Sequence, residues 1–247
     1  MKRTILILLI IVTSSLLPTY GQYRKQLQQY SAGIILGANL TDIKLSAECY
    51  SIYSHRWTPH PIVGGFFQYR SEEGFTIRPE MVYFGRGGGL SCQDVNYQLL
   101  AHCLSIRVGM RIDYVVPKLL FTLYGVVTPE VLFTLGGDVD YNSKNTGALN
   151  MSLSRSNMSI IDLGAFCGMG LEYPVFFHRR AIYISGEIGY HLNFINNLTS
   201  HETAGDITIL NYINMPPPAQ MTRLIGGFEL TVRVGIPFGK FIKIKRL

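Results

Sequence analysis

The sequence predicts an all-β fold: an eight-stranded antiparallel up-and-down transmembrane β-barrel with short periplasmic turns and long external loops. Three features lead to this prediction. Apolar and polar residues alternate in eight segments, the connections between the segments are short and long in turn, and the N-terminus carries an export signal. Strict alternation places successive side chains on opposite faces of a strand, and no helical period of comparable length competes with it.

The chain is poor in charge for its length of 247 residues. Charged residues make up 15% of it and hydrophobic residues 47%, whereas about 25% of the residues of a typical soluble domain are charged. The formal net charge is +6 at pH 7. This excess is too mild to indicate a nucleic-acid partner, and no nucleic acid is expected in the compartment of an exported protein.

Residues 1–21 are expected to form a cleaved signal peptide. Two basic residues precede an apolar run that Pro18 ends, and Thr19 and Gly21 fit the small-residue pattern of a signal-peptidase site. The run is shorter than the roughly 20 residues that a membrane-spanning helix needs. The mature domain is then the outer-membrane β-barrel domain of residues 22–247.

Eight alternating segments are the predicted strands. They are residues 31–40, 61–71, 75–85, 99–114, 119–136, 159–173, 181–195 and 221–238. The fourth shows the pattern most clearly, because its outer face is purely apolar and its inner face carries charge. The outer face consists of Leu104, Ile106, Val108, Met110, Ile112 and Tyr114, and the inner face of Cys103, Ser105, Arg107, Gly109, Arg111 and Asp113. Strands without helical crossovers pair in antiparallel fashion.

The lengths of the connections between strands indicate which end of the barrel is periplasmic and which is external. The short ones are residues 71–74, 115–118 and 174–180, and the long ones are residues 41–60, 86–96, 137–158 and 196–220. From a periplasmic N-terminus, all short links lie on the periplasmic side and all long links outside, as in outer-membrane barrels. The glycine-rich stretch 86–89 is predicted to be a mobile loop. It is not read as a phosphate-binding loop, because it opens no helix.

A soluble β-sandwich would also alternate, but it would carry most of its charge on the face that meets water. Here the charge lies on the face that also carries glycines and small residues, and the other face is almost uncharged. In water that face would be a belt prone to aggregation, whereas lipid requires it. The pattern therefore favours a membrane barrel whose first partner is outer-membrane lipid.

The polar face predicts an interior filled by charged side chains of both signs. They are Arg70, Arg78, Glu80, Arg107, Arg111, Asp113, Glu130, Asp162, Glu172, Glu187, Arg223, Glu229 and Arg233. Isolated charges are costly in a confined interior, so these groups are expected to pair. Eight strands leave a lumen just wide enough for such side chains. We interpret the set as a structural charge network rather than as the lining of an ion-selective pore.

No catalytic residue, metal ligand or cofactor is predicted, and the protein is expected not to be an enzyme. His191 shares a face with Glu187 and Ser185, a grouping that resembles a hydrolase site. Alternation alone brings such residues to one face, so a structural role is the preferred interpretation. His55 and His60 lie near Cys49 without any recognised metal-binding spacing.

The four cysteines are expected to differ in environment. An exported protein is in a compartment that permits disulfides. Cys49 and Cys92 lie in the first two predicted external loops and are a candidate pair, whereas Cys103 is expected to face inward and Cys167 outward.

The strand motifs also resemble a known family. In order along residues 33–238 they read "GIILGANLTDIK", "GGFFQYR", "FTIRPEMVYFGRGG", "LSIRVGMRIDY", "LYGVVTPEVLFTLGG", "IIDLGAFCGMGLEYPV", "ISGEIGYHLNFINN" and "GFELTVRVGIPF". This series resembles the PorT-type outer-membrane β-barrel family of Bacteroidetes. The most characteristic pieces are Gly-x-x-x-Gly-x-Asn-Leu in the first strand, Pro-Glu in the third and Asp-x-Gly-x-x-x-Gly-x-Gly in the sixth. The family's usual Ile-Pro in the fourth strand is replaced here, with Arg107 at that position.

The resemblance implies an outer-membrane location, no cofactor, and an association with the type IX secretion system, which exports proteins that carry C-terminal sorting domains. Other secretion-system proteins would then be partners. A filled eight-stranded lumen does not pass a folded protein, so the resemblance implies an accessory or assembly role. The alternative is a stand-alone barrel, either an OmpX-like structural protein or a minor channel.

Overall fold

The computed structural model describes residues 27–44, 54–92, 95–116, 121–143, 147–153, 159–177, 180–194 and 224–242. These residues form ten strands: β1 (Leu27–Lys44), β2 (Ser54–Arg56), β3 (Thr58–Arg70), β4 (Phe75–Cys92), β5 (Val95–Val115), β6 (Thr122–Ser143), β7 (Gly147–Ser152), β8 (Ile161–Phe177), β9 (Arg180–Asn193) and β10 (Leu224–Ile242). In this described part of the chain, no helix is both long enough and apolar enough to cross a membrane. The predicted signal peptide lies outside the described residues.

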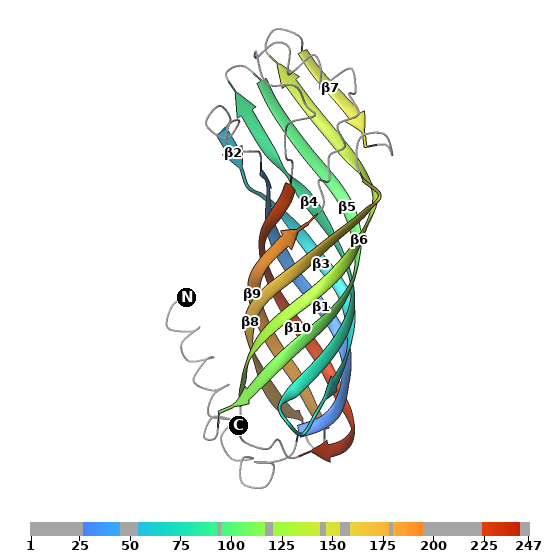
Figure 1. Cartoon of the computed structure of the whole chain (residues 1–247), viewed down its shortest axis with the longest axis vertical. Coiled ribbons are helices and arrows are strands. Elements are labelled where there is room, and N and C mark those ends of the chain that lie inside the picture. Colours follow the sequence, from blue (N-terminus) through green and yellow to red (C-terminus); the bar gives the residue numbers. More distant parts are fainter. Residues whose placement is uncertain are drawn as a thin grey trace.

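The strands close into a ring (Figure 1). Around it the order is β4, β3, β1, β10, β9, β8, β6 and β5, and β5 pairs back with β4. All of these pairings are antiparallel, including the one that joins the first strand to the last. Closure satisfies the backbone groups that an open sheet edge would expose to lipid. The predicted eight-stranded up-and-down barrel is confirmed.

The alternation of β5 gives the two faces that the sequence predicts. Its outward side chains from Ile106 to Tyr114 are exposed, with Ile112 at 65%. Its inward residues from Cys103 to Asp113 are buried. The same outward apolar character continues around the ring on β1, β4, β8, β9 and β10. This belt is the surface that contacts lipid.

Aromatic side chains gather at both borders of the belt. Near the short turns, Tyr30 of β1 stacks on Phe238 of β10 with the ring centroids 5.7 Å apart. Toward the long connections, Phe228 lies between Trp57 and Tyr190, at 5.9 Å and 5.0 Å from their centroids. Such girdles mark the two membrane–water interfaces of an outer-membrane barrel.

Three strands continue well past the belt, which the sequence did not predict. Figure 1 shows β4, β5 and β6 rising beyond the other strands as a sheet, flanked by β2 and β7, and the pairings β2–β4 and β6–β7 agree. The prediction of long loops at 86–96 and 137–158 is therefore wrong over most of those ranges. On this sheet the outward face of β5 becomes polar, with Gln98 and Asn96 exposed. We call this part the projecting sheet.

The glycine-rich stretch 86–89 is part of β4 and not a mobile loop. Its glycines are required by close approach of neighbouring strands. A Cβ atom on Gly88 would lie 2.8 Å from the backbone nitrogen of Ile43 in β1, and one on Gly87 would lie 1.9 Å from the carbonyl oxygen of Leu99 in β5. Backbone contact at such distances leaves no room for a side chain, so this run serves packing.

Candidate functional site

The interior of the barrel is the candidate site. Twelve of the thirteen predicted interior residues are described, and each is at most 4% exposed. They are Arg70, Arg78, Glu80, Arg107, Arg111, Asp113, Glu130, Asp162, Glu172, Glu187, Glu229 and Arg233. The predicted Arg223 lies outside the described residues. Period-two alternation turns each of these side chains inward, and they meet there in clusters.

The base cluster, next to the short turns, consists of Arg70, Arg111, Asp113 and Glu172. Asp113 accepts from Arg70 at 3.2 Å and from Arg111 at 2.7 Å. Glu172 accepts from Arg111 at 3.1 Å and also contacts Arg70. Two guanidinium groups therefore share two carboxylates, and each charge has partners of opposite sign.

The central cluster consists of Arg78, Glu80, Glu187 and Arg233. Glu187 accepts from Arg78 at 2.8 Å and from Arg233 at 2.9 Å. Glu80 accepts from Arg233 at 3.2 Å and also contacts Arg78. This cluster again holds two charges of each sign, contributed by β4, β9 and β10.

The upper cluster consists of Arg107, Glu130, Glu229 and His191. Arg107 donates to Glu130 at 2.8 Å through Nε, and to the two oxygens of Glu229 at 2.7 Å and 3.1 Å through Nη1 and Nη2. This bidentate contact with Glu229 fixes the orientation of the planar Arg107 guanidinium. Ser105 donates to Glu130 at 2.7 Å, and the His191 ring lies against the other oxygen of Glu130.

The mouth pair joins Arg86 and the predicted interior residue Asp162 at 2.7 Å, and only its arginine was not predicted from the sequence. Arg86 also donates to Thr134 at 3.4 Å, and Asn193 donates to Asp162. Arg86 lies within the predicted loop 86–96. Period-two alternation along β4 nevertheless places it on the same inward face as Arg78. Extending the alternation past 85 would have found it.

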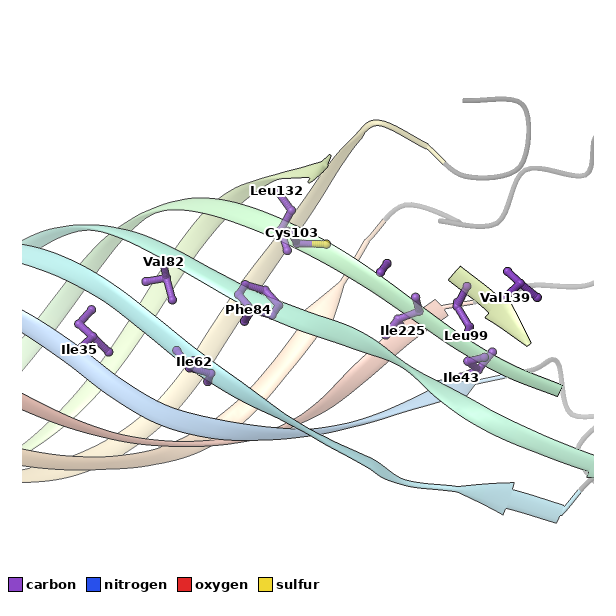
Figure 2. Close-up of a cluster of buried hydrophobic side chains, with 11 residues drawn as sticks. Ile35, Ile43, Ile62, Val82, Phe84, Leu99, Cys103, Leu132, Val139 and Ile225 are labelled. Atoms are coloured by element: carbon purple, nitrogen blue, oxygen red, sulfur yellow. The ribbon is translucent and has the colours of Figure 1, made fainter. Parts of the chain in front are cut away.

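A layer of apolar side chains shares the interior with these charges (Figure 2). Ile35, Ile62, Val82, Phe84 and Leu132 are each at most 2% exposed. The same cluster continues to Leu99 and Val139 of the projecting sheet, and to Ile43 of β1 and Ile225 of β10. The charged residues of the inner face were predicted from the sequence, but this apolar layer was not. Side chains fill a lumen of this width. Apolar side chains pack the part of it that the ion pairs do not occupy.

The end of the interior near the projecting sheet is crossed by direct contacts between β1 and β4. The last β3–β4 pair is Ile62 with Phe84, whereas β3 stays paired with β1 as far as Thr58 with Thr41. There Asn39 donates to the carbonyl of Gly85 at 2.9 Å, and the amide of Gly87 donates to Thr41 at 3.0 Å. These bonds tie β1 to β4 beside the apolar layer.

The family comparison determines the class of the protein. Residues 22–199 match the model of the family described as outer membrane protein beta-barrel domain. The chain belongs to this outer-membrane β-barrel family. The protein is accordingly an outer-membrane protein, and its apolar belt contacts membrane lipid.

Solved structures similar to this outer-membrane barrel are distant from it. Neisserial surface protein A, from Neisseria, is 12% identical, with 84% of this chain and 99% of that chain covered and a TM-score of 0.42. Ail, the attachment invasion locus protein of Yersinia pestis, is 11% identical, with 85% and 100% covered and a TM-score of 0.37. The translocator domain of the autotransporter NalP from Neisseria meningitidis is 11% identical, with 92% of both chains covered and a TM-score of 0.31. A comparison with curated proteins gave no match.

The hydrolase-like grouping at His191 is not assembled in the barrel. His191 contacts Glu130 and lies edge-on to Phe84, with ring centroids 5.9 Å apart. Glu187 instead binds Arg78 and Arg233. Within the described ranges, no three His, Cys, Asp or Glu side chains converge as metal ligands would.

Two of the four cysteines have the environments that alternation predicts. Cys103 is buried in the interior, and Cys167 is exposed on the outer face. The candidate disulfide rests on Cys49, which lies outside the described residues, and on Cys92, whose side chain also lies outside them.

Proposed function

We propose that this outer-membrane barrel is an accessory or assembly component of protein secretion, PorT-like and of the type IX kind. The strand motifs supply the link to secretion. The observation that carries the mode of action is the filled interior, because ion clusters and an apolar layer occupy the lumen at successive levels. The protein then acts through its surfaces and not as the conduit for its cargo.

Two surfaces support binding of other secretion-system proteins in this proposal. The apolar belt is accessible to partners within the membrane, and the projecting sheet is accessible outside it. The interior charge network has a structural role: it holds the strands in register and takes part in no reaction. The barrel is then not an enzyme and needs no cofactor.

Two features of the mature chain belong to the same proposal. The signal peptide comprises residues 1–21, in keeping with a family match that begins at residue 22. Cys49 and Cys92 form a disulfide. Non-reducing mass spectrometry of the purified protein tests both points, and two free thiols would contradict the disulfide.

The function is tested by a clean deletion in the native organism, followed by comparison of the secreted and surface proteomes with those of the parent. The expected result is loss of proteins with C-terminal sorting domains from the surface and trapping of their precursors in the periplasm. Complementation with the intact gene should restore export and serves as the control. An unchanged secretome would contradict the secretion role.

A stand-alone OmpX-like structural barrel is the second candidate, favoured by the polar outer face of the projecting sheet. It predicts unchanged export on deletion. The minor-channel variant of this candidate is tested separately by conductance in planar bilayers. Because buried side chains occupy the lumen, we expect no single-channel steps, and steady steps from the pure protein would contradict a filled interior.

A further inference from the structure

The projecting sheet has two margins, which differ in how well they are protected against pairing with another strand. Figure 1 shows β2 and β7 at these margins, and among the described residues β2 pairs with β4 and β7 with β6. Edge strands are templates for further pairing unless they are short, charged or interrupted by proline. β2 is protected in this way, because it has three residues, ends at the exposed Arg56 and is soon followed by Pro59.

β7 lacks these protections. Its six residues, GALNMS, include no charged side chain and no proline, and they pair with β6 without a bulge. The amide of Leu153 donates to the carbonyl of Gly137 at 2.8 Å, and from that pair onward every second pair of β6 and β7 exchanges hydrogen bonds. The N–H and C=O groups of Ala148, Asn150 and Ser152 therefore point away from β6, toward the margin of the sheet.

The outer face of the sheet beside this margin is acidic. Asp138 and Asp140 of β6 are exposed there, opposite Ser152 and Asn150 of β7. Asn150 donates to Asp140 at 2.6 Å, and the other outward side chains of β7, those of Ala148 and Ser152, are short. Among the described residues of β5, β6 and β7, this outer face of the projecting sheet carries no lysine or arginine. A further strand beside β7 would lie two strand spacings from β6, about 10 Å, which a long cationic side chain can bridge.

We propose that the margin of β7 binds an extended, basic segment of a partner protein as an additional strand of the projecting sheet. The backbone of the segment pairs with the outward-pointing residues of β7, and lysine or arginine side chains at alternate positions lie over Asp138 and Asp140. A second copy of the chain fits less well, because its own β7 offers no cation. The inference goes beyond the secretion role, since it rests on the sheet alone and holds equally for a stand-alone barrel.

Binding is tested with the full mature chain in detergent micelles and a short fluorescent peptide in which threonine and lysine alternate. Anisotropy titration should show saturable binding, and a matched peptide with glutamate in place of lysine should bind about tenfold more weakly or less. The double variant Asp138→Asn/Asp140→Asn should lose the preference for lysine. Glu73→Gln removes an exposed acid from a short turn and should leave it unchanged. Equal affinity for the two peptides, or no binding of the lysine peptide, would overturn the proposal.

Two substitutions at Asn150 separate strand addition from general attraction between charges. Asn150→Ala removes the side-chain hydrogen bond to Asp140 but keeps the backbone N–H, so it should bind the lysine peptide as the unmutated chain does. Asn150→Pro also removes the N–H, which points away from β6, and an edge strand tolerates proline at such a position. Its affinity should fall by about tenfold, as expected for the loss of one hydrogen bond. Equal affinity in the two variants would rule out strand addition.

Hydrogen exchange followed by NMR on the unmutated chain covers the case in which a variant does not fold. The amides of Leu149 and Met151 bond to β6 and should exchange slowly with or without the lysine peptide. The amides of Ala148, Asn150 and Ser152 should exchange fast in the chain alone and slowly once the peptide is bound. If these three amides are already protected without the peptide, by the chain itself or in a dimer seen by sedimentation, the margin is occupied and the proposal is wrong.

Discussion

Arg111 lies over the ring of Tyr124, with its guanidinium carbon 3.7 Å from the ring centroid. The hydroxyl end of the ring lies against Gly170 on the adjacent strand, where a Cβ atom would lie 2.4 Å from Tyr124 Cζ. Gly170 of β8, Tyr124 of β6 and Arg111 of β5 thus make successive contacts, and we call this set the Tyr124 stack. The glycine makes room for the ring, and the ring orients a member of the base cluster.

Tyr124→Ala should destabilise the barrel by about 3–5 kcal/mol, because it leaves a cavity in the stack. Tyr124→Phe is the control. The hydroxyl of Tyr124 has no hydrogen-bond partner among the described residues, so its removal should not lower stability. The free energy of unfolding in urea checks both variants, and a loss of similar size in both would contradict the stacking account.

Glu172→Gln should destabilise the barrel by about 3–5 kcal/mol, because it leaves Arg70 and Arg111 with Asp113 as their one remaining carboxylate partner in the cluster. The same substitution at Glu73, an exposed residue of a short turn, should change stability by less than about 0.5 kcal/mol. Equilibrium unfolding gives both values. Equal effects at the two sites would show that the buried position is not special.

Val108→Arg should destabilise the inserted barrel by about 2–4 kcal/mol, because Val108 points outward near the middle of the apolar belt. Gln98→Arg changes the same face of β5 on the projecting sheet, where the surface is polar, and should be close to neutral. Refolding titrations into lipid vesicles measure the difference. A strong effect at Gln98 would place the membrane boundary higher than the belt indicates.

Gly88→Ala should destabilise the protein by about 1–3 kcal/mol, because the new methyl group would press on the backbone of β1. Gly125→Ala is the matched control, since a Cβ atom there meets nothing within 4 Å. Thermal unfolding followed by gel mobility distinguishes them. If both glycines tolerate alanine equally, the β1–β4 contact is looser than described.

The barrel and its two faces could be predicted because lipid makes the pattern strict. Every outward position of β5 from Ile106 to Tyr114 has to be apolar, so that strand is recognisable without knowledge of its neighbours. The alternation does not show which interior side chains bind one another. Glu80 stands opposite Arg107 in the β4–β5 register but binds Arg78 and Arg233, because the lumen brings β10 across from the far wall.

The projecting sheet and Arg86 of the mouth pair were missed for a related reason. The glycines at 87–89 look like a loop when only local propensity is considered, whereas here they allow β1 and β5 to approach β4. Arg86 is interior only because that stretch is a strand. Alternation places Phe84 and Leu132 on the inner face, beside the outward Tyr83 and Phe133, but the prediction followed the charged residues of that face and did not include apolar ones.

The pairing of β1 with β10 has a consequence for the timing of biogenesis. Leu27 lies opposite Ile242, and Lys44 lies opposite Leu224, so the seam joins residues from the two ends of the described chain. During vectorial export β1 emerges first and has no seam partner until β10 follows, and contacts this distant in sequence form slowly. We therefore expect the complete polypeptide to insert in a single late step. A chain truncated before β10 should be degraded by periplasmic proteases and should not form a smaller barrel.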